Sequence, residues 1–123
     1  MKSKYKQSVQ KVISYFNTKE SRWGYSFLLK GTKHFGYYPK GKEKISMKNA
    51  QSLMELELGK RLNKPKNSLI LDAGSGEGNV AIHLAENSGF RIEGVDLLNF
   101  AVKNAREKVK NLGLDKQVNF QVG

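Results

Sequence analysis

The sequence predicts an α/β fold built on a parallel sheet, and three features of its second half support this. Between residues 68 and 122, three short apolar runs alternate with two segments of helical periodicity, the order of a β-α-β-α-β unit. The first run ends in a glycine-rich turn, LDAGSGEGNV, at residues 71–80, and the second run ends in Asp96. Right-handed crossovers would place the strands in the spatial order 3-2-1, with a ligand site at their carboxyl ends.

Length and composition bound the architecture and the environment. A chain of 123 residues has room for one hydrophobic core. It contains no cysteine, which excludes disulfides and thiolate chemistry and is compatible with the cytoplasm, the location that we expect. No apolar stretch approaches about 18 residues, so we expect no transmembrane segment, and we expect no bound metal.

The positive charge lies in the first half of the chain. The net charge is +11, and residues 1–66 carry 16 Lys and Arg against 4 Asp and Glu, whereas residues 67–123 carry 6 against 7. A basic region of this kind could meet nucleic acid or an anionic membrane surface. Scattered lysines on a solvated face explain the same numbers, so nucleic acid is a less favoured partner.

Residues 1–45 are expected to form an N-terminal helical cap on the remaining domain. Ser3 to Phe16 places apolar side chains at helical spacing, which predicts an amphipathic helix that packs on the core or forms a lid. Residues 17–45 are rich in aromatic side chains and are interrupted by glycines and Pro39, which predicts a loop with short turns. Such a cap either only packs on the domain or also covers a ligand, and the two interpretations are compatible.

Residues 46–123 are expected to form the ligand-binding domain, which begins with a helix over Ser46 to Leu62. Ser46 is a suitable N-cap, and Asn63-Lys64-Pro65 ends the helix. The apolar face of this helix is predicted to consist of Met47, Ala50, Leu53, Met54, Leu58 and Leu62.

The turn at residues 71–80 has the chemistry of a site for an anionic or polar ligand. Gly74, Gly76 and Gly78 allow positive φ and close approach of a ligand, and free N–H groups at the start of the next helix face it. Asp72 adds an acceptor, and Asp96 follows the first glycine by about 20 residues, where a carboxylate can accept hydrogen bonds from ribose. An ordinary βα turn would leave both acids unexplained.

The remaining elements complete the unit. Helices are predicted over residues 79–87 and 99–112, each closed by a glycine, and strands over residues 90–96 and 117–122. His83 lies on the first of these helices without an acid or cysteine at ligand spacing, and we interpret it as a surface or packing residue.

The glycine pattern distinguishes between cofactors. The dinucleotide fingerprint has its third glycine three residues after the second, a position that Asn79 occupies here, so NAD is disfavoured. The pattern Gly-x-Gly-x-Gly instead resembles motif I of the class I S-adenosylmethionine-dependent methyltransferases, with Ser75 between the first two glycines and Asp96 matching the ribose-binding acid. The resemblance implies a Rossmann-like fold and S-adenosylmethionine as the cofactor.

A second segment resembles one group within that family. HFGYYP, at residues 34–39, is similar to the His-x-Gly-Tyr-Trp-Pro segment of small-molecule methyltransferases related to the sterol, tocopherol and sarcosine enzymes. Tyr38 stands where those enzymes usually have tryptophan, a difference that concerns the substrate pocket. In those relatives the segment lies near the entrance for cofactor and substrate.

The resemblance implies methyl transfer from S-adenosylmethionine to a small-molecule or lipid acceptor, and it identifies no general base. The alternatives are an RNA or protein methyltransferase, favoured by the basic N-terminal half, and a non-catalytic nucleotide-binding module. Cofactor contacts are expected at Asp72, Ala73, Gly74, Ser75, Gly76, Gly78, Asp96, Leu97 and Tyr37, and substrate contacts at His34 and Tyr38.

The sheet of this family continues beyond three strands, so the resemblance covers its first half and implies that residues 46–123 are part of a longer domain. One edge of the first strand would then be bare. We expect the chain to be a fragment of a longer enzyme that, alone, is marginally stable, forms oligomers through this edge, or binds its cofactor weakly.

Overall fold

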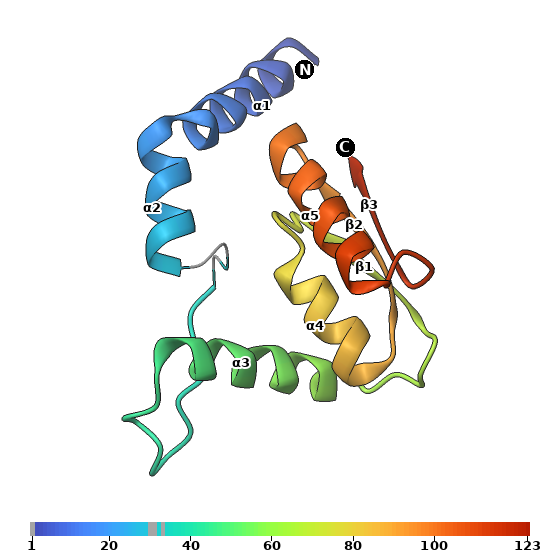
Figure 1. Ribbon diagram of the computed structural model, residues 1–123. Helices are drawn as coiled ribbons and strands as arrows, with labels where there is room; N and C mark the ends of the chain where they lie inside the picture. Colours follow the sequence, from blue (N-terminus) through green and yellow to red (C-terminus); the bar gives the residue numbers. More distant parts are fainter. Residues whose placement is uncertain (1, 30–31, 33) are drawn as a thin grey trace.

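The computed structural model describes residues 2–29, 32 and 34–123 and shows a three-stranded sheet with helices packed on it and an N-terminal helical arm (Figure 1). The elements follow in the order α1 (Lys2–Asn17), α2 (Lys19–Leu29), α3 (Met47–Leu62), β1 (Leu69–Ala73), α4 (Asn79–Ser88), β2 (Arg91–Asp96), α5 (Asn99–Leu112) and β3 (Val118–Val122).

The strands confirm the predicted topology. All pairings are parallel and the spatial order is β1-β2-β3, which is the expected order 3-2-1 counted from the other edge. In the middle of the sheet, Ile92 of β2 lies opposite Ile70 of β1 and Val118 of β3. Within the described residues β1 pairs with β2 alone, so its other edge is bare, as the sequence predicts.

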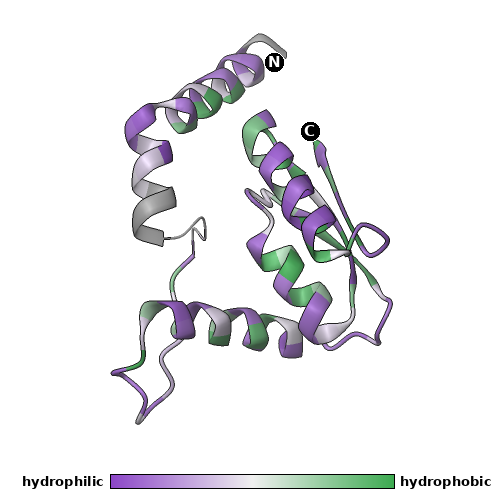
Figure 2. Cartoon of the chain, viewed as in Figure 1, coloured by the Kyte–Doolittle hydropathy of each residue, from purple (hydrophilic) through white to green (hydrophobic). Residues whose placement is uncertain are grey.

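One hydrophobic core lies between the sheet and the two crossover helices, α4 and α5. Both helices run alongside the same face of the sheet in Figure 1, and α4 is coloured mainly as hydrophobic in Figure 2, whereas the outer side of α5 is hydrophilic. Phe120, Ile92 and Val102 are at most 1% exposed in this core. Its buried members are Ala81, Ile82, Leu84, Ala85, Phe90, Ile92, Val102, Ala105, Val109, Val118 and Phe120.

Helix α3 begins and ends as predicted but buries only part of the predicted apolar face. Ser46 accepts a hydrogen bond from the Asn49 N–H at 3.2 Å, and Asn63 ends the helix in the left-handed conformation. The buried residues are Ala50, Gln51, Glu55 and Gly59. Of the predicted apolar face, Ala50 is fully buried and Leu62 packs, partly buried, against the core, whereas Gln51, Glu55 and Gly59 are buried without having been predicted.

The small residues on this buried face explain the difference. A Cβ added at Gly59 would lie 2.5 Å from Oγ of Ser88, so α3 approaches α4 closely only because Gly59 has no side chain. Met47, Met54 and Leu58 point elsewhere and are 45%, 37% and 41% exposed. Close approach between helices has decided which side of α3 is inside.

The prediction of a loop throughout residues 17–45 is also wrong, because α2 occupies residues 19–29. Thr18 caps this helix: its Oγ1 accepts a hydrogen bond from the Ser21 N–H at 3.2 Å. Gly24 lies inside the helix without ending it. The predicted loop is confirmed only between α2 and α3, where residues 32 and 34–46 contain no helix or strand.

Candidate functional site

The glycine-rich turn leaves β1 at Ala73 and is fixed to the neighbouring strand by its own backbone. The N–H groups of Gly74 and Ser75 donate to the carbonyl oxygen of Val95 at 2.8 and 3.1 Å, and the Gly78 N–H donates to the Ser75 carbonyl at 3.0 Å. The turn therefore lies at the carboxyl ends of β1 and β2, the edge at which open parallel sheets bind ligands.

The three glycines of the turn serve different purposes. All have positive φ, with values of 78° at Gly74, 54° at Gly76 and 78° at Gly78. A Cβ at Gly78 would lie 2.5 Å from Phe120, so this glycine is required for packing of α4 on the sheet. No atom lies within 4 Å of a Cβ added at Gly74 or Gly76, so these two face open space that a ligand can enter.

The carboxylate of Asp96 ties the turn to the start of α5. Its Oδ2 accepts from the Gly76 N–H at 2.8 Å, and its Oδ1 accepts from the Leu98 N–H at 2.9 Å. Each carboxylate oxygen has a second lone pair, so hydroxyl groups of a ligand can still donate to it. Asp96 is thus both a structural brace for the turn and an available acceptor.

Asp72 lies in the less favourable environment for a charged carboxylate. It is half-buried at the end of β1, and its Oδ2 is buried without a hydrogen-bond partner. Burial raises the pKa of the Asp72 carboxyl, and repulsion from Asp96 raises it further. A cationic group placed near this pair of acids would relieve both effects.

Two cavities adjoin the turn. The larger, about 440 Å³, is lined by Ala73, Gly74, Gly76, Val95, Asp96, Leu97, Leu98 and Gly123, and by Val12 and Phe16 of α1. The smaller, about 180 Å³, is lined by Thr32, His34, Gly74, Ser75, Gly76, Glu77, Asn79 and Val80. Gly74 and Gly76 line both cavities, and the N-terminal cap contributes to the wall of each.

The structure brings together most of the residues that the sequence indicates, with Ala73, Gly74, Gly76, Asp96 and Leu97 at the larger cavity and Ser75 and His34 at the smaller. Four predicted contacts line neither cavity: Asp72, Gly78, Tyr37 and Tyr38. The two tyrosines are 42% and 43% exposed. The backbone of Tyr37 is fixed, since its N–H donates to the Ala50 carbonyl at 2.8 Å. Contacts from the two tyrosines to a ligand stay predictions.

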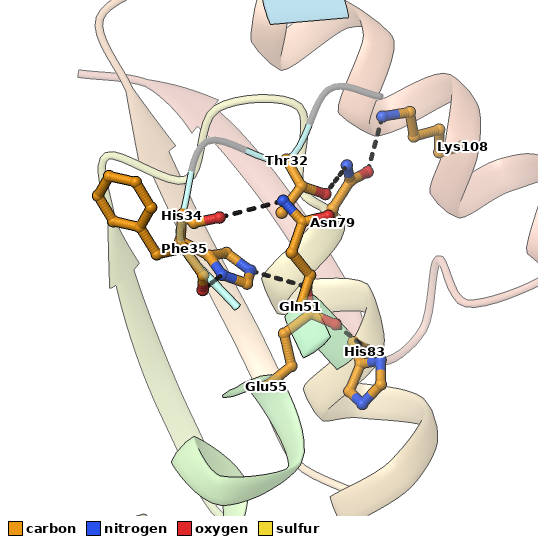
Figure 3. Close-up of polar contacts among 8 residues, drawn as sticks. All are labelled: Thr32, His34, Phe35, Gln51, Glu55, Asn79, His83 and Lys108. Carbon is orange, nitrogen blue, oxygen red and sulfur yellow. Dashed lines mark hydrogen bonds and ion pairs between the residues drawn. The ribbon is translucent and has the colours of Figure 1, made fainter. Parts of the chain in front are cut away.

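A polar network beside the smaller cavity was not predicted (Figure 3). Glu55, which is 6% exposed, lies with its two oxygens 3.0 Å from Nε2 of His34 and 2.9 Å from Nδ1 of His83. His83 does pack between helices, as expected, but its acidic partner is on another helix and no local spacing reveals it. The one sequence pattern that could indicate the position of Glu55 is its spacing of four residues from both Gln51 and Gly59, which places the three residues on one side of a helix.

A second set of polar contacts reaches α5. Asn79 donates from Nδ2 to Thr32 Oγ1 at 2.8 Å and accepts from the Lys108 ammonium at 2.9 Å (Figure 3). The same ammonium contacts a carboxylate oxygen of Glu77 at 3.2 Å. The start of α4 is therefore linked both to the segment before α3 and to α5.

Among residues 2–29, 32 and 34–123, no three His, Cys, Asp or Glu side chains are grouped so that they could hold a metal ion. In the same ranges, no helix is long and apolar enough to cross a membrane.

Comparison with known proteins places this geometry in a family. Residues 64–123 match the model of a family described as "Methyltransferase domain". The "S-adenosyl-L-methionine-dependent Diels-Alderase iccD" of Talaromyces variabilis is 38% identical over 112 residues, which are 89% of this chain and 38% of that protein. The norajmaline N-methyltransferase of Rauvolfia serpentina is 32% identical, over 93% of this chain and 41% of that protein.

Solved methyltransferase structures have the same fold as this chain. Geranyl diphosphate C-methyltransferase from Streptomyces coelicolor superposes with a TM-score of 0.73 at 22% identity, over 94% of this chain and 47% of that one. The chain spans about two fifths of the length of the curated relatives that it matches. The glycine turn, the two acids at the strand ends and these similarities together show that the chain belongs to the class I S-adenosylmethionine-dependent methyltransferases.

Proposed function

We propose that the protein transfers a methyl group from S-adenosylmethionine to a small-molecule or lipid acceptor, with this chain supplying the cofactor-binding half of the site. The observation that carries the proposal is the open space beside Gly74 and Gly76. The backbone of these two glycines borders a cavity that Asp96 also lines. Small-molecule acceptors are favoured because one relative is named as a norajmaline N-methyltransferase.

The charges of the site suit this cofactor. S-adenosylmethionine has a sulfonium and an ammonium group, and the two acids at the strand ends supply negative potential close to the turn. Asp96 would accept hydrogen bonds from the ribose hydroxyls, and the turn would hold the methionyl portion by its backbone. Asp72 would be a second polar anchor whose unfavourable burial a cationic ligand offsets.

Methyl transfer depends more on how the protein positions the cofactor and the acceptor than on protein groups that form bonds to them. The acceptor displaces the thioether from the methyl carbon in line, so the acceptor atom gains the methyl group and the sulfonium becomes a neutral thioether. Catalysis of this kind depends on holding both reactants at the right distance and on proton removal where the acceptor requires it. Val12 and Phe16, which line the larger cavity from α1, would help to exclude water.

Calorimetric titration of the full chain with S-adenosylmethionine, S-adenosylhomocysteine and NAD tests the proposal. We expect saturable binding of the first two and no binding of NAD. Asp96→Ala should weaken binding by about 10- to 100-fold, because a charged acceptor is lost. Asp96→Asn keeps an acceptor oxygen for only one of the two backbone N–H groups that donate to Asp96, so the folded state of both variants is checked by circular dichroism.

The matched control is Asp115→Ala, which removes an exposed carboxylate from the connection between α5 and β3. It should leave the affinity unchanged. Binding of NAD alone would overturn the assignment of the cofactor, and equal affinities of the wild type and Asp96→Ala would remove Asp96 from the site.

A second candidate function retains the cofactor without transferring its methyl group. It is favoured by the 38% identity to a protein named as an S-adenosyl-L-methionine-dependent Diels-Alderase. In that case the cofactor would be bound and not consumed. Incubation with methyl-labelled S-adenosylmethionine and candidate acceptors separates the two, since label moves to the product only in methyl transfer.

A further inference from the structure

The carboxylate of Glu55 is the most unusual polar group in the described residues outside the glycine turn. It lies on α3, almost fully buried, where an ionised carboxylate is costly unless its oxygens are hydrogen-bonded. The imidazoles of His34 and His83 approach one oxygen each, from the segment before α3 and from α4 (Figure 3). Three separate parts of the chain therefore meet at one carboxylate.

The partners of His34 define its protonation. Its Nδ1 lies 2.8 Å from the carbonyl oxygen of Phe35, and its Nε2 lies 3.0 Å from Oε1 of Glu55. A carbonyl oxygen and a carboxylate both accept, whereas a neutral imidazole has a single N–H to donate. Both contacts are satisfied when His34 is an imidazolium and Glu55 is its counter-charge.

The contacts of His83 differ from those of His34, because only one of its ring nitrogens has a partner. Its Nδ1 donates to Oε2 of Glu55 at 2.9 Å, while its Nε2 is buried without a hydrogen-bond partner. A proton on that nitrogen would be a buried donor without an acceptor, which is unfavourable. A neutral His83 with its proton on Nδ1 satisfies the contact to Glu55 without burying a second donor, and Lys48, Glu86 and Lys108 line the cavity that it shares with Glu55.

Other contacts place His34 at the wall of the smaller cavity. Gln51 donates from Nε2 to the His34 carbonyl at 3.0 Å, and the Tyr37 N–H donates to Ala50, so α3 holds the segment by its backbone on both sides of Gly36. A Cβ at Gly36 would overlap Ala50, and only glycine lets the segment lie this close to the helix. The side chain of His34 is the part that Glu55 fixes.

We propose that Glu55 is a positioning residue: it holds His34 as an imidazolium at the wall of the cavity beside Gly74 and Gly76 and thereby sets the affinity of the site for its cofactor. The link to affinity rests on the proposed function. The cation at this wall would face anionic or polar groups of the ligand, while Glu55 itself lines neither cavity next to the turn.

The test combines a spectroscopic and a thermodynamic measurement on Glu55→Gln. Imidazole ¹⁵N NMR of the wild-type chain should show protons on both nitrogens of His34 and on Nδ1 alone of His83. A glutamine amide can donate to Nε2 of His34 and accept from His83, so the variant keeps the contacts while His34 becomes neutral. The affinity for S-adenosylhomocysteine should fall about tenfold.

Two comparisons separate positioning from general stability. Glu57→Gln makes the same change on the exposed side of α3, where Glu57 pairs with Lys60, and should alter neither measurement. In a double-mutant cycle, Glu55→Gln should have no further effect on affinity once His34→Ala is present. If Glu55→Gln does not fold, the wild-type imidazole signals and the affinity of His34→Ala decide the question.

A neutral His34 in the wild type, or an affinity of folded Glu55→Gln within twofold of the wild type, would overturn the proposal. If the wild-type chain binds neither S-adenosylmethionine nor S-adenosylhomocysteine, the proposed function fails. The imidazole signals still decide whether Glu55 controls His34 in that case.

Discussion

The two faces of the sheet are built from alternate residues of the same strands, yet they differ sharply in burial. On the face toward α4 and α5, Ile92 is 1% exposed and Phe120 is 0% exposed. On the opposite face, Leu69 is 58% exposed and Leu71 is 67% exposed. The side chains on both faces are apolar, so the difference in burial comes from what packs on each face. A hydrophobic strand specifies two apolar faces, and the helices decide which becomes core.

The covered face should dominate stability, and Phe120→Ala tests this most strongly. Removal of the fully buried ring next to Gly78 and Gly94 leaves a cavity that the surrounding helices cannot fill. We expect the free energy of unfolding to fall by about 3–5 kcal/mol, enough to unfold a marginal domain. Urea denaturation followed by circular dichroism measures it. A loss below about 1 kcal/mol would show that the covered face is not the main core.

Adding volume to the same face should have the next largest effect. A Cβ at Gly94, in the middle of β2, would overlap the ring of Phe120. Gly94→Ala should therefore destabilise the chain by about 1–3 kcal/mol through overpacking. Gly24→Ala is the control: φ at Gly24 is outside the left-handed region and nothing lies within 4 Å of an added Cβ, so it adds the same methyl group without strain or clash. Equal losses in the two variants would contradict the packing explanation.

Asp72, at the end of β1, should make stability depend on pH. Because the pKa of its carboxyl is raised in the folded state, the folded chain binds this proton more tightly than the unfolded chain does. The resulting stabilisation is complete below the ordinary carboxyl pKa and is lost as the pH rises through the elevated value. Asp72→Asn should remove that part of the pH dependence, as unfolding curves between about pH 4 and 7 would show. An unchanged pH profile would contradict the raised pKa.

The open face should give the smallest change in stability. Leu71 is largely exposed, so Leu71→Ser should alter the free energy of unfolding by no more than about 0.5 kcal/mol. Its visible effect should be on association, because an exposed apolar face and a bare strand edge favour contact between chains. Analytical ultracentrifugation of both forms measures this. A loss comparable with that of Phe120→Ala would mean that the open face is buried in solution.

The site was easier to predict than the cap because its signals are local. Gly74, Gly76 and Asp96 are bounded by strand and helix patterns within a single β-α-β unit, and the structure places them at one cavity. The sequence does not predict α2, because glycines such as Gly24 usually interrupt a helix, whereas the structure continues the helix through Gly24 from a cap at Thr18. A hydrophobic pattern predicts only part of the inner face of α3, because the close approach at Gly59 also buries the polar side chains of Gln51 and Glu55.

The sequence by itself determined the parallel order of the strands, the glycine turn and the acid that braces it, since these follow from residue types at short spacings. Only the tertiary structure decided that Glu55 joins His34 to His83, and that Val12 and Phe16 of α1 line the larger cavity. Such contacts join segments far apart in the chain, and their geometry depends on how closely α3 and α4 pack. Local patterns encode elements and turns, whereas burial and long-range hydrogen bonds arise only when those elements meet.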